Sequence, residues 1–320
     1  MTTHRASLII ATYNRGTRIA PTLDSVLAQT ARPEETLVVD DCSPDRTGDW
    51  VAQHYPAARV VRPERNGGTS AARNFGAKAA AGDVLVFLDH DDLLHPHAVA
   101  TLLDLLAAFP EAHAAFADHV YDNKATGTRF PDHHSSQPAF HRMKAVPVLR
   151  SSPAGRVYGK PMYHALLWGN ILQQPWAIRR ETFLALGGFA EDVRYCEDWD
   201  LYTRLAQRFP VVVSDAVISD HVVEGENLHL APGQEEMHER VLLRRWKDAG
   251  PLDFRAGSIV RRKLGLLYKG WADRAPDKRS AWALDVRSAL CWPFDLTCTL
   301  RAVLGLVGLR PGRSSQEVRT

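Results

Sequence analysis

The sequence predicts an α/β fold in which helices flank a mostly parallel sheet, followed by a helical extension toward the C-terminal end. Three observations support this prediction. Apolar runs of strand length alternate with helix-periodic segments over residues 1–120, which is the pattern of a parallel sheet covered on both faces. The strand runs end in polar residues. Beyond Glu235 the periodicity is helical throughout, and prolines punctuate it.

The first strand and the first helix introduce this alternation. Ala6–Thr12 (ASLIIAT) is an apolar run typical of a buried strand, and Ile19, Leu23, Val26 and Leu27 follow it at helical spacing. Further elements continue the pattern. In chain order they are strand Thr36–Asp40, helix Thr47–His54, strand Ala58–Val61, helix Ser70–Ala80, strand Val84–Leu88, helix Pro96–Phe109 and strand Ala114–Asp118.

The pattern weakens after the first 120 residues. Residues 121–165 are rich in His, Pro, Ser and Gly and show little periodicity, so we expect a long loop or lid there. Order returns with a strand at Gln174–Ile178, a helix at Asp198–Phe209 and a strand at Val211–Val217. The predicted organisation is therefore a core of residues 1–235, with a nucleotide-binding half at 1–120 and an acceptor or catalytic half at 121–235, and a basic helical extension at 236–320.

The charge distribution is uneven although the net charge is only +2. Residues 241–320 contain 16 Lys/Arg and 7 Asp/Glu, a balance of +9, so the other 240 residues carry −7. A near-neutral total argues against nucleic acid as a partner. The four cysteines form no C-x-x-C pair, and no apolar run has the length of a signal-peptide core or a membrane span. These features indicate a cytoplasmic protein with a basic tail.

Polar residues follow three of the predicted strands. Thr12-Tyr13-Asn14-Arg15 follows the first, Asp40-Asp41 the second, and Asp89-His90-Asp91-Asp92 the fourth. Ligands of open parallel sheets bind at the carboxyl ends of the strands, so we expect a site at this edge. Two aspartates in a D-x-D pattern point the same way from extended backbone and suit a hard divalent cation such as Mg2+. The alternative is an acidic turn, with Asp92 capping the next helix.

Three further segments carry candidate chemistry. One carboxylate of Asp40-Asp41, at a strand end, is suited to accept hydrogen bonds from a base or ribose, or else the pair belongs to a turn. Asn66-Gly67-Gly68-Thr69 opens a helix that carries Arg73, an arrangement that holds phosphate or is a plain helix entry. The adjacent acids Glu197 and Asp198 begin another helix, where they serve as a general base or as caps.

The histidines suggest two candidate metal-binding sites, and the sequence favours the second. Asp132-His133-His134 resembles half of a zinc site, but no H-E-x-x-H motif or suitably placed cysteine completes it, so we disfavour zinc. His221 follows the last predicted strand and is the better candidate for binding a metal or a phosphate.

Taken together, five segments resemble glycosyltransferase family 2, which has the GT-A fold. They are SLIIATYNR, LVVDDCSPD, NGGTSAARN, VFLDHDD and the pair GGF and CEDWDL, which occur in this order across residues 6–220. The resemblance implies an inverting glycosyltransferase of the hexosyltransferase type that depends on Mg2+ or Mn2+. It would move a sugar from a nucleotide diphosphate donor to a saccharide or lipid-linked acceptor in polysaccharide, glycolipid or cell-envelope biosynthesis.

The resemblance also implies roles for individual residues. Asp198 would be the catalytic base, with Glu197 beside it, and Asp91, Asp89 and His221 would form the metal set. Asp41 would accept the N3–H of uracil or thymine, which favours a UDP- or dTDP-sugar. The remaining nucleotide-sugar residues would be Ala11, Thr12, Tyr13, Arg15, Gly68, Arg73, Asp89 and His90, the last without a catalytic duty. Donor sugar or acceptor would contact Trp168, Gly169, Asn170 and Trp199.

The basic extension and two competing functions complete the sequence-based predictions. Four tryptophans lie among the cations of residues 241–320, and Leu296–Leu309 is apolar, a composition that suits an anionic membrane surface or a helical cap packed on the core. A nucleotidyltransferase also uses metal carboxylates on a parallel sheet, but Tyr13-Asn14-Arg15-Gly16 lacks its glycine-rich loop. A non-catalytic sugar-nucleotide-binding protein would not need acids at both sites.

Overall fold

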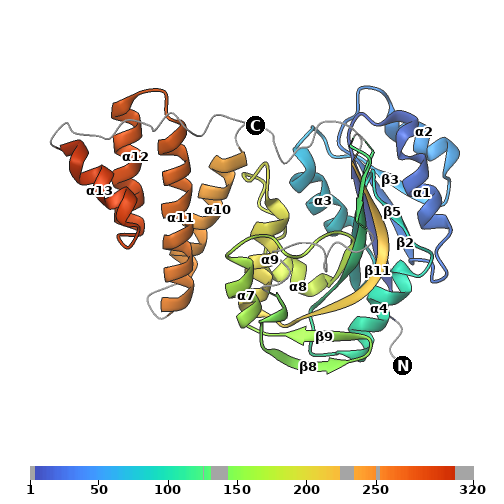
Figure 1. Cartoon of the computed structure of the whole chain (residues 1–320). Helices are drawn as coiled ribbons and strands as arrows, with labels where there is room; N and C mark the ends of the chain where they lie inside the picture. The colour runs from blue at the N-terminus through green and yellow to red at the C-terminus, as the bar shows by residue number, and fades with distance from the viewer. Residues whose placement is uncertain (1–3, 125, 131–142, 224–233, 250–252, 307–320) are drawn as a thin grey trace. The chain divides into compact units, whose positions relative to one another are not determined.

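The computed structural model describes residues 4–124, 126–130, 143–223, 234–249 and 253–306 (Figure 1). The chain divides into two compact units, Met1–Gln234 and Glu235–Thr320. The first unit contains the sheet and the second is helical. Among the described residues, no helix combines the length and the apolar character needed to span a bilayer.

The sheet of the first unit follows the order β3-β2-β1-β4-β10-β6-β11-β9-β8, and the short strands β5 and β7 pair with β11 and β6. β3, β2, β1 and β4 are mutually parallel. β10 runs antiparallel between β4 and β6, and β11 is again parallel to β6. The strands are β1 (Ala6–Thr12), β2 (Glu35–Asp40), β3 (Ala58–Val61), β4 (Val84–Asp89), β5 (Leu93–Leu94), β6 (Ala114–Asn123), β7 (Thr128–Phe130), β8 (Val148–Ser152), β9 (Gly155–Tyr158), β10 (Trp176–Arg179) and β11 (Val211–Val223).

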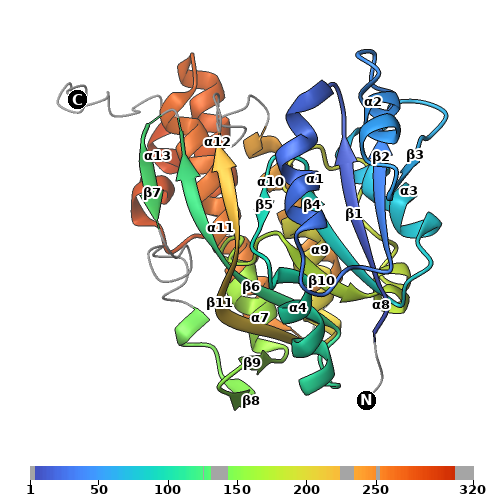
Figure 2. The ribbon, with the colours of Figure 1, turned by 90° about the vertical axis from the view of Figure 1, so that its right-hand side faces the viewer.

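Helices cover both faces of this sheet (Figures 1 and 2). α1, α2 and α4 lie on one face, and α3, α8 and α9 lie on the other. The helices of this unit are the 3-10 helix η1 (Gly16–Ile19) and the α-helices α1 (Ala20–Leu27), α2 (Thr47–His54), α3 (Gly68–Ala79), α4 (Ala98–Ala108), α7 (Pro161–Leu166), α8 (Arg180–Ala185) and α9 (Glu197–Arg208). The prediction of a mostly parallel sheet flanked by helices is confirmed.

Aromatic side chains on the α9 face lock the middle of the sheet together. Phe87 of β4, Trp176 of β10 and Phe116 of β6 lie in register across three strands. The Trp176 ring stacks on Phe116 with centroids 5.2 Å apart, and Tyr202 of α9 meets both rings edge-on. All four side chains are fully buried. Because large buried aromatics dominate packing energy, this cluster holds α9 against the sheet. It thereby also positions Glu197, the first residue of α9.

Three expectations about the elements of the first unit need correction. Residues 121–165 are not one long loop, since β7, β8, β9 and α7 occupy most of their described part. β9 pairs with β11, which is far away in the sequence. The pattern of residues 121–165 alone therefore gave no sign of this strand. β6 and β11 extend to Asn123 and Val223, well beyond the predicted ends, because they pair with each other along that length. Residues 132–134, the disfavoured zinc half-site, lie outside the described residues.

The second unit consists of four helices in its described part: α10 (Gln234–Ala249), α11 (Phe254–Arg274), α12 (Lys278–Cys291) and α13 (Leu296–Leu306). Asp253 and Asp277 cap α11 and α12 with their carboxylates, which satisfies backbone N–H groups at the start of each helix. α11 and α12 approach closely at Gly265, where an added Cβ would lie 2.8 Å from the Cβ of Trp292. Ser288 donates to the Gly265 carbonyl at 2.8 Å.

Candidate active site

The carboxyl ends of β1, β2 and β4 meet at one edge of the sheet. Thr12 lies opposite Asp40, and Ala11 lies opposite Asp89. Because these strands are parallel and in register, the residues that follow each strand converge, as the sequence pattern predicts. β10 runs the other way, so Gln174, two residues before the start of β10, reaches the same edge.

The loops after β1 and β2 are tied to each other. Thr47 at the start of α2 accepts hydrogen bonds from the backbone N–H groups of Arg15 at 3.0 Å and Gly16 at 2.8 Å, and it donates to Asp45 at 2.6 Å. These contacts hold the β1 loop while leaving the Tyr13 ring 49% exposed at the edge. An exposed, positioned aromatic ring is suited to stack against a base.

Asp41 orders the glycine turn that opens α3. Its carboxylate accepts from the backbone N–H groups of Gly67 at 3.0 Å and Gly68 at 2.8 Å, while its carbonyl accepts from the Asn66 amide at 2.9 Å. Gly68 has a φ of +81°, a conformation that favours glycine. Each carboxylate oxygen has more than one acceptor position, so this structural role leaves room for the predicted contact with a base.

Arg73 joins the two acidic segments of the site. Its buried guanidinium donates to Asp89 at 2.5 Å and to Glu197 at 2.9 Å, and it lies over the Phe189 ring. Burial alone would lower the pKa of Arg73, but the two carboxylates outweigh that effect and raise it. The same pairing holds the pKa of Asp89 below its ordinary value, although burial acts in the opposite direction. Arg73 is therefore a fixed positive charge between β4 and α9.

Asp198 is an acid at this edge whose pKa lies well above its ordinary value. Burial, and then the neighbouring Glu197, raise its pKa from the ordinary 3.8 of an aspartate to about 7. Asn170 donates to one carboxylate oxygen at 2.7 Å, and the Trp199 backbone N–H donates to the other at 2.7 Å. A held carboxyl that ionises near neutral pH is suited to general acid–base chemistry.

Asp92 and His221 form a pair that the sequence did not predict. β5 pairs with β11, with Asp220 opposite Leu93, and this places His221 Nδ1 2.8 Å from Asp92 Oδ1. Burial raises the pKa of Asp92 to about 6, against the opposing effect of His221. Burial lowers the pKa of His221, but Asp92 outweighs it and raises that pKa to about 9. Asp92 does not cap α4, whose first flanking residue is His97.

The two carboxylates of the D-x-D segment differ in exposure and in their contacts. Asp91 is half-exposed, with Arg15 Nη2 at 3.7 Å and His90 Nε2 at 3.6 Å from its Oδ2. Asp89 is less exposed and pairs with Arg73. Within the described parts of the chain, no group of three or more His, Cys, Asp or Glu is arranged to hold a metal by itself. Two carboxylates completed by phosphate oxygens are nevertheless a donor set that Mg2+ accepts, so these residues fit a cation that arrives with a diphosphate.

The expected sugar-contacting residues differ in accessibility. Trp168, Gly169 and Asn170 follow α7 and are partly exposed, and an added Cβ at Gly169 would meet nothing within 4 Å. Trp199 is buried, and its indole N–H donates to the Leu166 carbonyl at 2.6 Å. Trp199 thus anchors α9 to α7 beneath the site.

Sequence reasoning assigned no role to Gln174 or to Phe189, although Phe189 belongs to the GGF segment. With its amide oriented to suit both neighbours, Gln174 accepts from Arg73 at 2.8 Å and donates to Asp89 at 3.2 Å. Phe189 follows the Gly187-Gly188 turn and supports Arg73 from below. The only sequence signal for Gln174 is its place at the start of the predicted strand Gln174–Ile178, and that signal becomes useful only once the strand is known to be antiparallel.

Comparisons with known proteins converge on one family. The profile described as "Glycosyl transferase family 2" matches residues 7–163. An uncharacterized glycosyltransferase of Haemophilus influenzae is 30% identical over 201 residues, which are 63% of this chain and 62% of that protein. An uncharacterized glycosyltransferase of Rickettsia typhi is 26% identical over 238 residues, 73% of this chain and 69% of that protein. The succinoglycan biosynthesis protein ExoO of Rhizobium meliloti is 36% identical over 118 residues, 37% of this chain and 32% of that protein.

A solved structure shares the fold. S. aureus TarS 1–349 in complex with UDP-GlcNAc superposes with a TM-score of 0.64 at 18% identity, covering 95% of this chain and 92% of that chain. The complex of the same fragment with UDP gives a TM-score of 0.58.

Proposed function

Because the chain belongs to glycosyltransferase family 2 and has the GT-A fold, we propose that it transfers a sugar from a nucleoside diphosphate donor to a hydroxyl group, with inversion. The acceptor would be a saccharide or a lipid-linked saccharide in polysaccharide or glycolipid assembly. The observation that carries the proposal is Asp198. Its carboxyl ionises near neutral pH at the same sheet edge as the D-x-D segment.

The acceptor step follows from this placement. Asp198 takes the proton of the acceptor hydroxyl as its oxygen attacks the anomeric carbon, and the bond from that carbon to the diphosphate oxygen breaks, leaving its electron pair on the diphosphate. Asn170 orients the carboxylate from one side, and the Trp199 backbone N–H orients it from the other. Arg73 donates to the Glu197 carboxylate at 2.9 Å, so the second acid is held in an ion pair beside the base.

The donor side is proposed from the loops at the carboxyl edge. Tyr13 would stack on the base, and Asp41 would accept an N–H of uracil or thymine. The presence of UDP-GlcNAc and UDP in the TarS complexes supports a uridine donor. Asp91 and Asp89 would hold Mg2+ or Mn2+ with the diphosphate, and that cation would offset the charge of the leaving group as a Lewis acid.

A donor panel tests the proposal. UDP-, dTDP- and GDP-sugars are incubated with the protein and Mn2+, and nucleotide release is scored with and without candidate acceptors. We expect release from a uridine or thymidine donor that falls at least about a hundredfold in Asp198→Asn. Asp104→Asn, on the exposed side of α4, is the matched control and should retain full activity. Undiminished release by folded Asp198→Asn would remove Asp198 as the base.

A further inference from the structure

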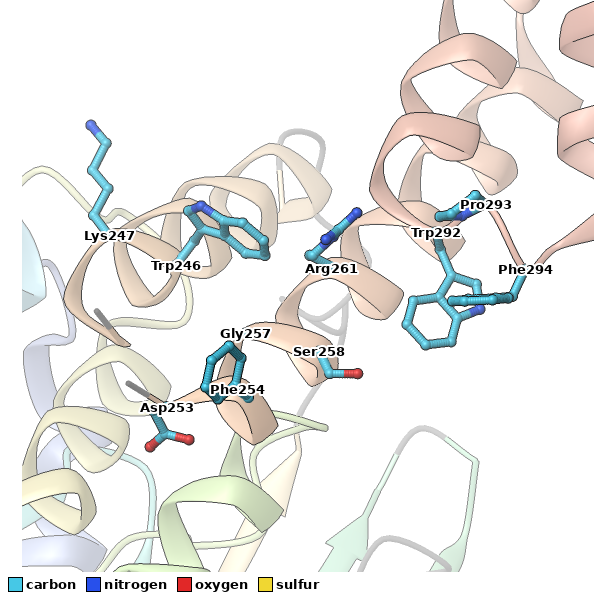
Figure 3. Close-up of a pocket in the computed structure, with 10 residues that line it drawn as sticks. All are labelled: Trp246, Lys247, Asp253, Phe254, Gly257, Ser258, Arg261, Trp292, Pro293 and Phe294. Atoms are coloured by element: carbon cyan, nitrogen blue, oxygen red, sulfur yellow. The ribbon is translucent and has the colours of Figure 1, made fainter. Parts of the chain in front are cut away.

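The helical second unit contains a cavity that the proposed transfer reaction does not use. Its volume is about 690 Å3, and every residue that lines it belongs to residues 235–320 (Figure 3). The lining comes from α10, from the first turns of α11 and from the connection between α12 and α13. Four aromatic side chains and two cations dominate it: Trp246, Phe254, Trp292, Phe294, Lys247 and Arg261.

Two large apolar side chains of the cavity lining, and Leu296 two residues beyond Phe294, are exposed to solvent. Phe254 is 83% exposed, Phe294 is 77% exposed and Leu296 is 79% exposed. The Trp292 and Phe294 rings pack against each other with centroids 5.3 Å apart, so the aromatic wall is continuous on that side. Single exposed apolar residues are ordinary, but several gathered around one cavity mark an interaction surface.

Cations are built into the same surface. Arg261 donates to the carbonyls of Cys291 at 3.1 Å and Leu290 at 3.4 Å, and its guanidinium lies 5.7 Å from the centroid of the Trp246 ring. Arg262 lies 5.8 Å from the centroid of the Trp292 ring. The sequence from 241 to 320 carries 16 Lys/Arg against 7 Asp/Glu. The occupant of such a surface should offer both hydrocarbon and negative charge.

Two kinds of occupant can be compared on chemistry. A saccharide site stacks sugar on aromatic rings but also needs several neutral or acidic groups to read the hydroxyls. Here Asp253 already caps α11 by accepting from Ala256 at 3.0 Å, and the other polar lining groups are Ser258 and the two cations. The surface of an anionic bilayer offers apolar depth for the exposed rings and phosphate for the cations. The lining therefore favours the bilayer.

We propose that this surface, defined by Trp246, Phe254, Trp292, Phe294 and Leu296 and called the aromatic face below, docks on an anionic lipid bilayer. The rings of Phe254 and Phe294 and the Leu296 side chain enter the interfacial layer, while Lys247 and Arg261 meet lipid phosphates. Binding of this kind requires no catalysis, so the inference stands apart from the proposed transferase activity and is tested without it.

The test is flotation of the full chain with vesicles of phosphatidylcholine alone or mixed with phosphatidylglycerol, at low salt. We expect co-flotation with the mixed vesicles and a blue shift of tryptophan emission. Burial of one large apolar side chain changes an equilibrium by about tenfold or more, so the triple variant Phe254→Ser, Phe294→Ser, Leu296→Ser should bind at least about a hundredfold more weakly. Leu149→Ser, at a residue 64% exposed on β8, is the matched control and should bind as the parent does.

Three outcomes would overturn the proposal. The first is a full chain that stays at the bottom of the gradient with anionic vesicles. The second is a triple variant that floats as well as the parent while circular dichroism shows both folded. The third is quenching of the tryptophans by soluble oligosaccharides without lipid, together with release of the protein from vesicles, which would make the cavity a saccharide site.

Discussion

Replacing Glu197 by Gln should move the pH dependence of turnover toward acid. In the parent protein the pKa of Asp198 is raised to about 7, first by burial and then by the adjacent Glu197 carboxylate. If Asp198 is the base, the rate follows its ionised fraction, about one tenth at pH 6 and about nine tenths at pH 8. The parent should therefore show an acid limb centred near pH 7.

The size of the displacement follows from the local charges. Two neighbouring carboxylates at a partly buried site repel by roughly 1–3 kcal/mol, and one pKa unit corresponds to about 1.4 kcal/mol. Glu197→Gln removes that repulsion and also releases the Arg73 charge from its partner, and both effects favour ionised Asp198. The limb should move down by about one to two pH units, so the ratio of the rate at pH 6 to that at pH 8 should rise about fivefold or more.

The assay is nucleotide release from saturating donor between pH 5 and pH 9, with each profile normalised to its own maximum. Normalisation separates the position of the limb from any loss of absolute rate when the Arg73 contact is broken. Glu181→Gln, which alters an exposed acid in the first turn of α8, is the matched control and should leave the limb in place. A limb that stays near pH 7 in Glu197→Gln, or that moves to higher pH, would refute the assignment of Asp198 and the electrostatic reasoning together.

Three further predictions concern stability and metal dependence. The folded pKa of His221, about 9, lies above its ordinary 6.5, so its contribution is complete below pH 6.5 and is lost as the pH rises through 9. Between pH 6.5 and pH 9 the free energy of unfolding of the parent, measured in urea, should fall by about 2 kcal/mol more than that of His221→Gln, after discounting for partial exposure. Equal losses of unfolding free energy in the two proteins would contradict the pairing with Asp92. Gly76→Ala places a Cβ 2.7 Å from a side-chain carbon of β1 and should destabilise the protein by about 1–3 kcal/mol. Gly257→Ala, whose added Cβ meets nothing within 4 Å, should stabilise it by about 0.5–1 kcal/mol. A higher melting temperature for Gly76→Ala than for Gly257→Ala would be inconsistent with that packing. Chelation should abolish turnover and Mn2+ should restore it, while Asp91→Asn should need about tenfold more Mn2+; turnover that survives exhaustive chelation would exclude the metal proposal.

The parallel half of the sheet was predictable because its signals are local. β1, β2, β3 and β4 are short apolar runs separated by helix-periodic segments, and a parallel connection of that kind leaves few alternative topologies. The polar residues that end these strands could be assigned to one edge for the same reason. The direction of β10 could not be predicted, since a four-residue strand pairs with whichever neighbours the rest of the fold supplies.

The side-chain pairings inside the site could not be predicted from the sequence. Arg73 appears in the sequence only as a basic residue one turn into a helix, and its partner Glu197 is 124 residues away. Asp92 and His221 are 129 residues apart and meet only because β5 pairs with β11. Sequence patterns report periodicity and turn chemistry, whereas these contacts depend on how distant strands are ordered in the sheet.

The position of β10 also bears on how the chain is made. β10 separates β4 from β6 in the sheet, yet the ribosome synthesises it after both. A nascent chain that has not yet reached Arg179 therefore carries two apolar strands whose neighbouring edges have no partner. Unpaired strand edges promote association between chains, so we expect the incomplete chain to be more prone to aggregation than the complete one. Any shortened version made for expression should accordingly extend past Arg179.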